Sequence, residues 1–217
     1  MIRILILTFF TCLLTTLTWG QVVSGINFDE IKLAVSKPGN TNYQTLLKRA
    51  AALDSTLTLN DYKLLYFGQV FQSNYSPSGD AVGLQNANKL VQAGKFDEGI
   101  AATEEYLKSY PISLSAIYLK LTALYQQKKT VEMRPWIMLL KGLIAAITGS
   151  GDGKTEKTAM VVACVSDEYK VMSSLQVQKT EQALTNTQCD KMTLAPNSAG
   201  LTELYFNVSK PFGKGFN

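Results

Sequence analysis

The absence of histidine limits the chemistry open to this chain more than any other feature of its sequence. Ser-His-Asp and Cys-His nucleophilic catalysis both need an imidazole as the general base. Protein zinc sites usually use histidine, or more cysteines than the two, Cys164 and Cys189, that lie beyond the first twenty residues. The sequence therefore assigns no catalytic residue, no metal ligand and no cofactor-binding residue.

A glycine-rich segment, GSGDGKT at residues 149–155, resembles part of a phosphate-binding loop. The full motif reads G-x-x-x-x-G-K-[ST], but Thr148 occupies the place of its first glycine. A phosphate site also needs a helix after the loop, so that N–H groups at the helix N-terminus face the anion. Here the pattern indicates a helix before the loop and a strand after it. We therefore interpret the segment as a connector.

Carboxylates that are adjacent in sequence, Glu104-Glu105 and Asp167-Glu168, are the other groups that could transfer protons. Neighbouring residues on a helix point about 100° apart, so neither pair is arranged for joint acid–base catalysis. We expect the first pair on a solvated helix face and the second at a helix N-terminus. Two carboxylates that face each other across a cleft would not be visible in sequence. An enzyme that uses carboxylates or a Ser/Lys pair therefore stays an alternative.

The two remaining cysteines, Cys164 and Cys189, both fall in the predicted β-rich segment. In an oxidising compartment they could form a disulfide. They could equally be two separate buried thiols, because cysteine often behaves as a small core residue. The sequence does not give the Cα separation that would decide between these alternatives.

Residues 1–20 have the pattern of a secretory signal peptide. Arg3 supplies the positive charge, residues 4–17 form the apolar segment, and the small residues Thr18 and Gly20 precede the expected cleavage site. This pattern predicts an exported protein, located in the periplasm or outside the cell.

The rest of the chain has no pattern that predicts a membrane span or nucleic-acid binding. Its longest apolar run, Trp136–Ile147, has 12 residues and includes Lys141, which suits a buried helix rather than a membrane span. The net charge of +4 argues neither for nor against nucleic acid, whereas export argues against it. We expect a protein or peptide partner, no nucleic acid, and no membrane span in the mature chain.

Residues 80–111 predict two amphipathic helices joined at Gly94-Lys95. Apolar or small residues recur at helical spacing on each side of Gly94, and Pro111 ends the unit. The spacing resembles a tetratricopeptide repeat, although Gly99 replaces the usual alanine. A plain helical hairpin is the alternative.

Helices are also predicted before and after this pair. Three helices are predicted before it, capped by Asn27, by Asn42 or Thr41, and by Thr58, and Asp61 would complete a capping box with Thr58. Two further helices are predicted over residues 113–127 and 130–148.

The C-terminal third differs in character. Strands are predicted over residues 158–165, 177–186, 191–194 and 204–208, with a short helix over residues 167–174. The fold class is therefore α+β, with a small antiparallel β segment at the C-terminus. We expect a signal peptide (1–20), a helical region like tetratricopeptide repeats (21–150), and a small β-rich segment packed on it (151–217).

Four segments together resemble one known family: TLTLNDYKLLYFG (56–68), the loop 149–153 with Lys154, VSDEY (165–169) and LYFNVSKP (204–211). They are similar to the family numbered 4919 among domains of unknown function, whose members are mostly exported proteins of Bacteroides-type bacteria. The resemblance implies a location in a Gram-negative envelope and a repeat-like helical body with a β tail. It implies no catalytic residue.

These observations favour a non-enzymatic, exported protein that binds another protein or serves as a scaffold, because helical-repeat faces usually present concave surfaces to peptides. A structural subunit of an envelope complex is a further alternative to the enzyme. The candidate partner-binding residues are Tyr62, Tyr66, Asn88, Gln92 and Tyr118. For each of them, packing in the core or exposure on a solvated surface is the competing interpretation.

Overall fold

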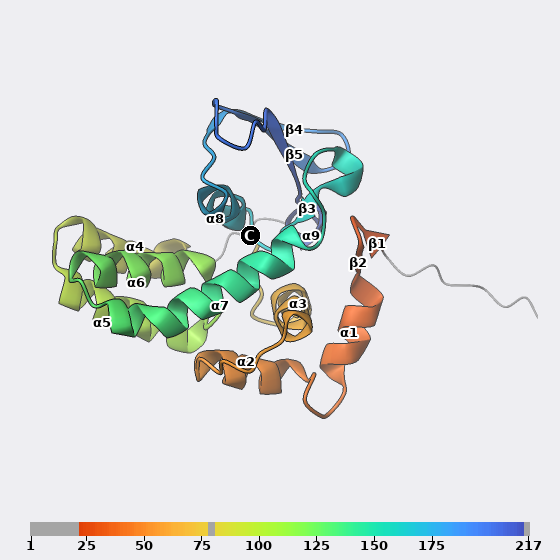
Figure 1. Ribbon diagram of the computed structural model, residues 1–217. Coiled ribbons are helices and arrows are strands. Elements are labelled where there is room, and N and C mark those ends of the chain that lie inside the picture. Colours follow the sequence, from red (N-terminus) through yellow and green to blue (C-terminus); the bar gives the residue numbers. More distant parts are fainter. Residues whose placement is uncertain (1–21, 78–80, 215–217) are drawn as a thin grey trace, which may run out of the picture.

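The computed structural model describes residues 22–77 and 81–214, which form a helical body beside a small sheet (Figure 1). The expected signal peptide, residues 1–20, lies outside the described residues. The α-helices are α1 (Phe28–Ser36), α2 (Tyr43–Ala51), α3 (Leu59–Gly68), α4 (Ala81–Gln92), α5 (Phe96–Ser109), α6 (Leu114–Gln126), α7 (Thr130–Thr148), α8 (Ser166–Ser174) and α9 (Ser209–Lys214). The strands are β1 (Val22–Val23), β2 (Ile26–Asn27), β3 (Met160–Val161), β4 (Lys179–Leu184), β5 (Cys189–Leu194) and β6 (Glu203–Asn207). The α+β class is confirmed.

Side-chain caps fix where the N-terminal helices begin. The Asn27 Oδ1 accepts hydrogen bonds from the backbone N–H groups of Asp29 and Glu30, at 3.1 and 3.2 Å. At α3 the Thr58 hydroxyl accepts from the Asp61 N–H at 3.2 Å, and the Asp61 carboxylate accepts from the Thr58 N–H at 2.9 Å. These bonds satisfy donors that the first helical turn leaves unpaired. The predicted capping box is confirmed.

The central helices α4 and α5 form the predicted hairpin. Gly94 has φ +75°, a left-handed conformation that glycine adopts without strain, and its N–H bonds to the Val91 carbonyl at 3.1 Å. A Cβ on Gly99 would lie 2.6 Å from a Val91 methyl group, so glycine lets the two helices approach closely. Helix α6 packs beside this hairpin, and α7 packs against α6. The likeness to a tetratricopeptide repeat stays a prediction.

The C-terminal sheet has the strand order β3-β6-β5-β4. Strands β4, β5 and β6 are antiparallel, as predicted, but β3 pairs with β6 in parallel, through Met160 with Phe206 and Val161 with Asn207. The sheet is therefore mixed rather than wholly antiparallel. The chain between β3 and β6 contains α8 and the β4–β5 hairpin, which is long enough for a parallel crossover.

The strand expected over residues 158–165 is shortened to the two residues of β3. Its apolar run is buried, as its sequence indicated, with Val162 and Ala163 at most 1% exposed. The backbone of Ala163 bonds to tyrosines instead of a neighbouring strand: its N–H donates to the Tyr66 hydroxyl at 3.0 Å, and its carbonyl accepts from the Tyr75 hydroxyl. These side-chain bonds replace a strand ladder and direct the chain into α8.

One continuous core joins the helical body to the sheet. It includes Phe28 of α1, Tyr66 of α3, Leu143 of α7, Val171 of α8 and Phe206 of β6, all fully or almost fully buried. Helix α7 runs from the central helices to the sheet (Figure 1) and packs against α3, α6 and α8. Its 19 residues span about 28 Å, so this helix links the two parts.

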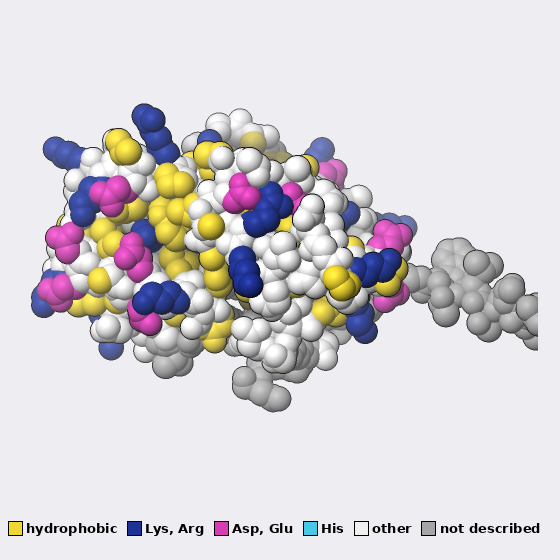
Figure 2. All heavy atoms as spheres, turned by 90° about the horizontal axis from the view of Figure 1, so that it is seen from below, with side chains coloured by type: hydrophobic (Ala, Val, Ile, Leu, Met, Phe, Trp, Pro, Cys, Tyr) yellow, Lys and Arg dark blue, Asp and Glu magenta, His cyan; other side chains and the backbone are white. Residues whose placement is uncertain are grey.

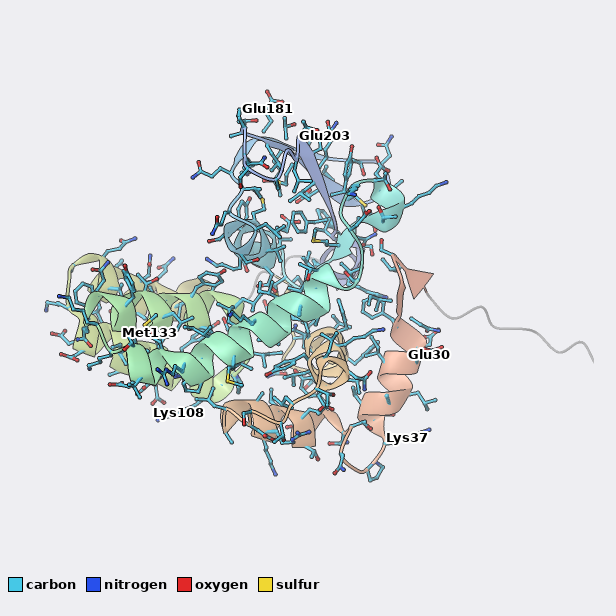
Figure 3. The ribbon with its side chains drawn as sticks, in the orientation of Figure 1. Glu30, Lys37, Lys108, Met133, Glu181 and Glu203 are labelled. Carbon is cyan, nitrogen blue, oxygen red and sulfur yellow. The ribbon has the colours of Figure 1, made fainter. Side chains whose placement is uncertain are left out.

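The surface combines apolar and charged areas. Figure 2, which views the molecule from below, shows hydrophobic side chains gathered in a band over the helical part, with side chains of both charges around it. The exposed large hydrophobic side chains include Leu59, Tyr125, Val131 and Met138. At the opposite end of the molecule from α2, Figure 3 labels Glu181, whose side chain is exposed on β4.

Candidate functional site

A cavity of about 610 Å³ lies between the helical body and α8. Its walls come from α2, the segment 69–76, α4, the α5–α6 junction, α6 and the start of α8. The size falls within the range of small-molecule and peptide sites. The cavity therefore gathers segments that are far apart in sequence around one space, and it is the candidate site among the described residues.

Uncharged polar and aromatic side chains dominate the lining. It includes six side-chain amides, from Gln44, Gln69, Gln72, Asn74, Gln85 and Asn88. It also includes five tyrosines, namely Tyr43, Tyr75, Tyr106, Tyr110 and Tyr118. The rings of Tyr106 and Tyr110 are stacked, with centroids 4.9 Å apart and 28° between their planes. Such a wall offers both donors and acceptors, together with flat apolar surfaces.

Asp167 is the one acidic residue among the described lining, and it is 5% exposed. Its Oδ2 accepts a hydrogen bond from the Tyr66 hydroxyl at 2.7 Å. The same hydroxyl accepts from the Ala163 N–H, so Tyr66 joins the chain before α8 to the carboxyl group on α8. Burial raises the pKa of Asp167 to about 7, although the Tyr66 bond and the charge of Lys170 oppose this rise. The carboxyl group can thus change protonation near neutral pH.

Lys170 is the one basic residue of that lining and is partly buried. Its ammonium lies 5.5 Å from the centre of the Tyr118 ring, and its backbone carbonyl accepts from the Tyr118 hydroxyl at 3.1 Å. Burial lowers the pKa of Lys170, while the nearby Asp167 carboxylate opposes this effect. Tyr118 therefore fixes the α8 backbone and lies beneath the lysine side chain.

Ser166 also lines the cavity, at the first position of α8. Ser166, Asp167 and Lys170 thus occupy one helix end within a single cavity. Asp167 lies in the first turn, where the helix dipole favours a negative charge. A carboxyl group with a pKa near 7 has the protonation behaviour of a general acid or base. The same group can bind a cationic or hydrogen-bond-donating part of a ligand.

The residues predicted from sequence fall in different places. Asn88 and Tyr118 line the cavity. Tyr66 is fully buried behind the wall, where it holds Asp167. Tyr62 is 8% exposed and contacts Gly142 of α7, away from the cavity, and Gln92 is exposed on α4 without lining it.

Asp167 and Lys170 were not among the site residues predicted from the sequence. Asp167 was predicted at a helix N-terminus, and it does lie in the first turn of α8. The burial of its side chain was not predicted, because an acidic residue in a first helical turn is usually solvated. The apolar run immediately before α8 was the available signal, since it brings this helix end into the interior.

The two cysteines are thiols in the structure, and they have different surroundings. The Cys164 thiol donates to the Ser76 carbonyl at 3.5 Å, at the cavity wall. Cys189 is buried at the start of β5, near the Glu156 carbonyl and the Asn207 amide. The disulfide that the sequence allowed is therefore not formed here, because the two side chains contact different segments.

A second buried carboxyl group, Glu168, lies next to Asp167 but outside the cavity lining. It is 0% exposed, and among the described residues neither of its oxygens has a hydrogen-bond partner of acceptable geometry. Burial raises its pKa to about 9, and the nearby Asp190 carboxyl group raises it further. Gln182 donates to Asp190 at 2.8 Å. Glu168 is therefore protonated in the folded protein at neutral pH.

The described residues contain neither a candidate metal site nor a candidate membrane-spanning helix. No group of three or more potential metal ligands occurs in residues 22–77 and 81–214. Within the same ranges, no helix has the length and apolar character required to cross a bilayer.

Comparison with known proteins gives one result. No curated protein and no solved structure matches this chain. A family model described as Domain of unknown function (DUF4919) matches residues 29–214, which is most of the sequence. This match confirms the resemblance drawn from the four sequence segments. The chain therefore belongs to the DUF4919 family.

Proposed function

We propose that this protein is an exported, non-enzymatic binding protein that receives a peptide in the cavity between the helical body and α8. The observation that carries the proposal is the lining of that cavity by six amides and five tyrosines. A peptide backbone presents both N–H and C=O groups, and side-chain amides can bond to either. Tyrosines add apolar contact at low cost in conformational entropy.

Export is proposed from residues 1–20, with their single positive charge and apolar segment. The location is then the periplasm or the outside of the cell, and the family resemblance favours a Gram-negative envelope. In those compartments peptides and exposed protein segments are available as ligands.

The test is retention of peptides by the purified mature protein, residues 21–217. A mixture of short synthetic peptides is equilibrated with the protein, and the retained fraction is identified by mass spectrometry. We expect retention by the wild type and loss in an Asn88→Ala, Tyr118→Ala double variant, because both side chains line the cavity. Asn60→Ala is the matched control, since Asn60 is exposed on α3 and does not line it.

Two results would oppose this proposal. If no peptide is retained at millimolar concentration, the cavity does not serve peptides. If the double variant retains peptides as well as the wild type does, binding occurs elsewhere on the surface. Circular dichroism of each variant separates loss of binding from loss of fold.

A second candidate function is an envelope enzyme, and Asp167 is the observation that favours it. A carboxyl group with a pKa of about 7 shares one cavity with Ser166 and Lys170. Such a group is suited to general acid–base catalysis. The test is incubation of the protein with peptides and envelope polymers, followed by mass spectrometry of the products. Turnover that Asp167→Asn abolishes would favour the enzyme over the binding protein.

A further inference from the structure

The charges of the cavity are confined to one wall. Asp167 and Lys170 are the charged side chains of the described lining, and both belong to α8. Residues three positions apart on a helix lie on the same face, with Cβ atoms about 5–6 Å apart. One carboxyl group and one ammonium group therefore stand side by side, and the remaining lining is neutral.

The Asp167 carboxyl group has bonding capacity left for a ligand. Its Oδ2 accepts from Tyr66, while no hydrogen bond to Oδ1 is present within the described part of the chain. A carboxylate can accept at both oxygens. The Tyr66 bond holds the group in one orientation, because that hydroxyl is itself held by the Ala163 N–H. The second oxygen is thus available to a donor in the cavity.

Lys170 is placed in a comparable way. In the described ranges its ammonium forms no ion pair, and the Tyr118 ring lies 5.5 Å from it. Its three donors can therefore serve an anion in the cavity. Tyr118 anchors the backbone at the same residue, through the bond from its hydroxyl to the Lys170 carbonyl.

From this arrangement we infer that the ligand is a short free peptide, most closely a dipeptide, whose terminal ammonium binds Asp167 and whose terminal carboxylate binds Lys170. This deepens the peptide-binding function proposed above and rests on it. The Asp167 and Lys170 charges balance each other in the empty cavity, so a ligand with only one charge would leave the occupied site with an unbalanced charge, which is costly where the dielectric constant is low. A ligand with one positive and one negative charge gives both Asp167 and Lys170 a partner and keeps the site neutral.

The spacing of the two groups limits the length of the ligand. An extended chain spans at most about 3.3–3.6 Å per residue, so the ends of a dipeptide lie about 7 Å apart. That separation suits two groups on adjacent turns of one helix, whereas longer extended peptides separate their ends too widely. The cavity of about 610 Å³ leaves room for two large side chains against the amides and tyrosines.

The experiment is equilibrium dialysis of the mature protein against three sets of dipeptides of the same sequences, with the retained fraction measured by mass spectrometry. One set has free termini, one is N-acetylated and one is C-amidated. We expect the free set to be retained and each blocked set to bind at least tenfold more weakly. This comparison needs no variant, so it remains decisive if a substitution prevents folding.

Variants then assign the two ends. In Asp167→Asn the amide oxygen still accepts from Tyr66 but carries no charge, so this variant should no longer distinguish free from N-acetylated dipeptides. Lys170→Gln should likewise stop distinguishing free from C-amidated dipeptides. The matched controls are Glu181→Gln and Lys37→Gln, both at exposed positions that do not line the cavity, and both labelled in Figure 3.

Each outcome has one meaning. Equal binding of free and blocked dipeptides overturns the inference and leaves the proposed peptide-binding function in place. Asp167→Asn with altered thermal stability but unchanged selectivity also overturns it, because Asp167 would then have only a structural role. If no dipeptide or longer peptide binds, or if only neutral oligosaccharides in a parallel dialysis bind, the inference and the proposed function both fall.

Discussion

Substitution of Glu168 by glutamine should remove most of the loss of stability that the wild-type protein shows between pH 5 and pH 8. Glu168 is 0% exposed, and its pKa is raised from 4.5 to about 9, first by burial and then by Asp190. The folded protein therefore keeps this proton over a pH range in which the unfolded chain releases it. A raised folded pKa gives stability that is complete below pH 4.5 and is lost as the pH rises toward 9.

The magnitude follows from proton linkage. Each pH unit between the two pKa values lowers the free energy of unfolding by about 1.4 kcal/mol. Over three units, allowing for partial protonation at pH 5, this one group contributes a loss of about 4 kcal/mol. Glutamine has nearly the same shape and does not titrate, so the contribution disappears. Asp167 loses its own proton over part of the same range, and its contribution remains in both proteins.

The assay is urea unfolding of both proteins at pH 5 and pH 8, followed by circular dichroism. The quantity to compare is the difference between the two free energies of unfolding within each protein, because a buried glutamine amide has its own cost at every pH. Glu181→Gln is the control, since this exposed side chain is solvated in both states and should leave the pH dependence unchanged. A pH dependence in Glu168→Gln within 1 kcal/mol of the wild type would refute the reasoning, because Glu168 would then ionise in the fold.

Three further predictions test the site and its support. Tyr66→Phe should lower the free energy of unfolding by about 1–3 kcal/mol, measured by urea titration, because Asp167 and the buried Ala163 N–H both lose their partner; a change below 0.5 kcal/mol would contradict this. Gly142→Ala should destabilise by about 1–3 kcal/mol in the same assay, since the new Cβ would lie 2.3 Å from the Tyr62 ring; an increase in melting temperature would instead show that α3 and α7 separate without cost. Dipeptide affinity should fall as the pH is lowered from 8 to 6, because Asp167 has a pKa of about 7 and binds an ammonium only when ionised. The titratable groups near this carboxyl group are Tyr66, Tyr75, Glu168 and Lys170. Isothermal titration should find no such pH dependence in Asp167→Asn.

Much of the helical body could be predicted from the sequence because its signals are local. The Asn27 cap and the Thr58–Asp61 capping box depend on residues within three positions of one another. The turn at Gly94 depends on one residue that tolerates a positive φ. Caps and turns of this kind are determined by neighbouring residues, so they can be predicted without knowledge of the tertiary contacts.

The candidate site was harder to predict because it depends on contacts between distant residues. Asp167 is bonded by Tyr66, 101 positions earlier, and the expected strand is shortened because Tyr66 and Tyr75 take the backbone bonds of Ala163. No periodicity in residues 158–165 indicates a tyrosine from another helix. Asn88 and Tyr118 were predicted from their polar and aromatic character and do line the cavity, whereas Tyr62 has the same character and packs against α7.

The central claim is that a peptide binds in the cavity against α8. The most direct test is a ¹H–¹⁵N correlation spectrum of the isotopically labelled mature protein, recorded during titration with the unblocked dipeptides. We predict saturable shifts of the backbone amides in residues 164–170 and 112–118, two segments that contribute side chains to the cavity lining. An unchanged spectrum, or shifts confined to residues that do not line the cavity, would contradict the account.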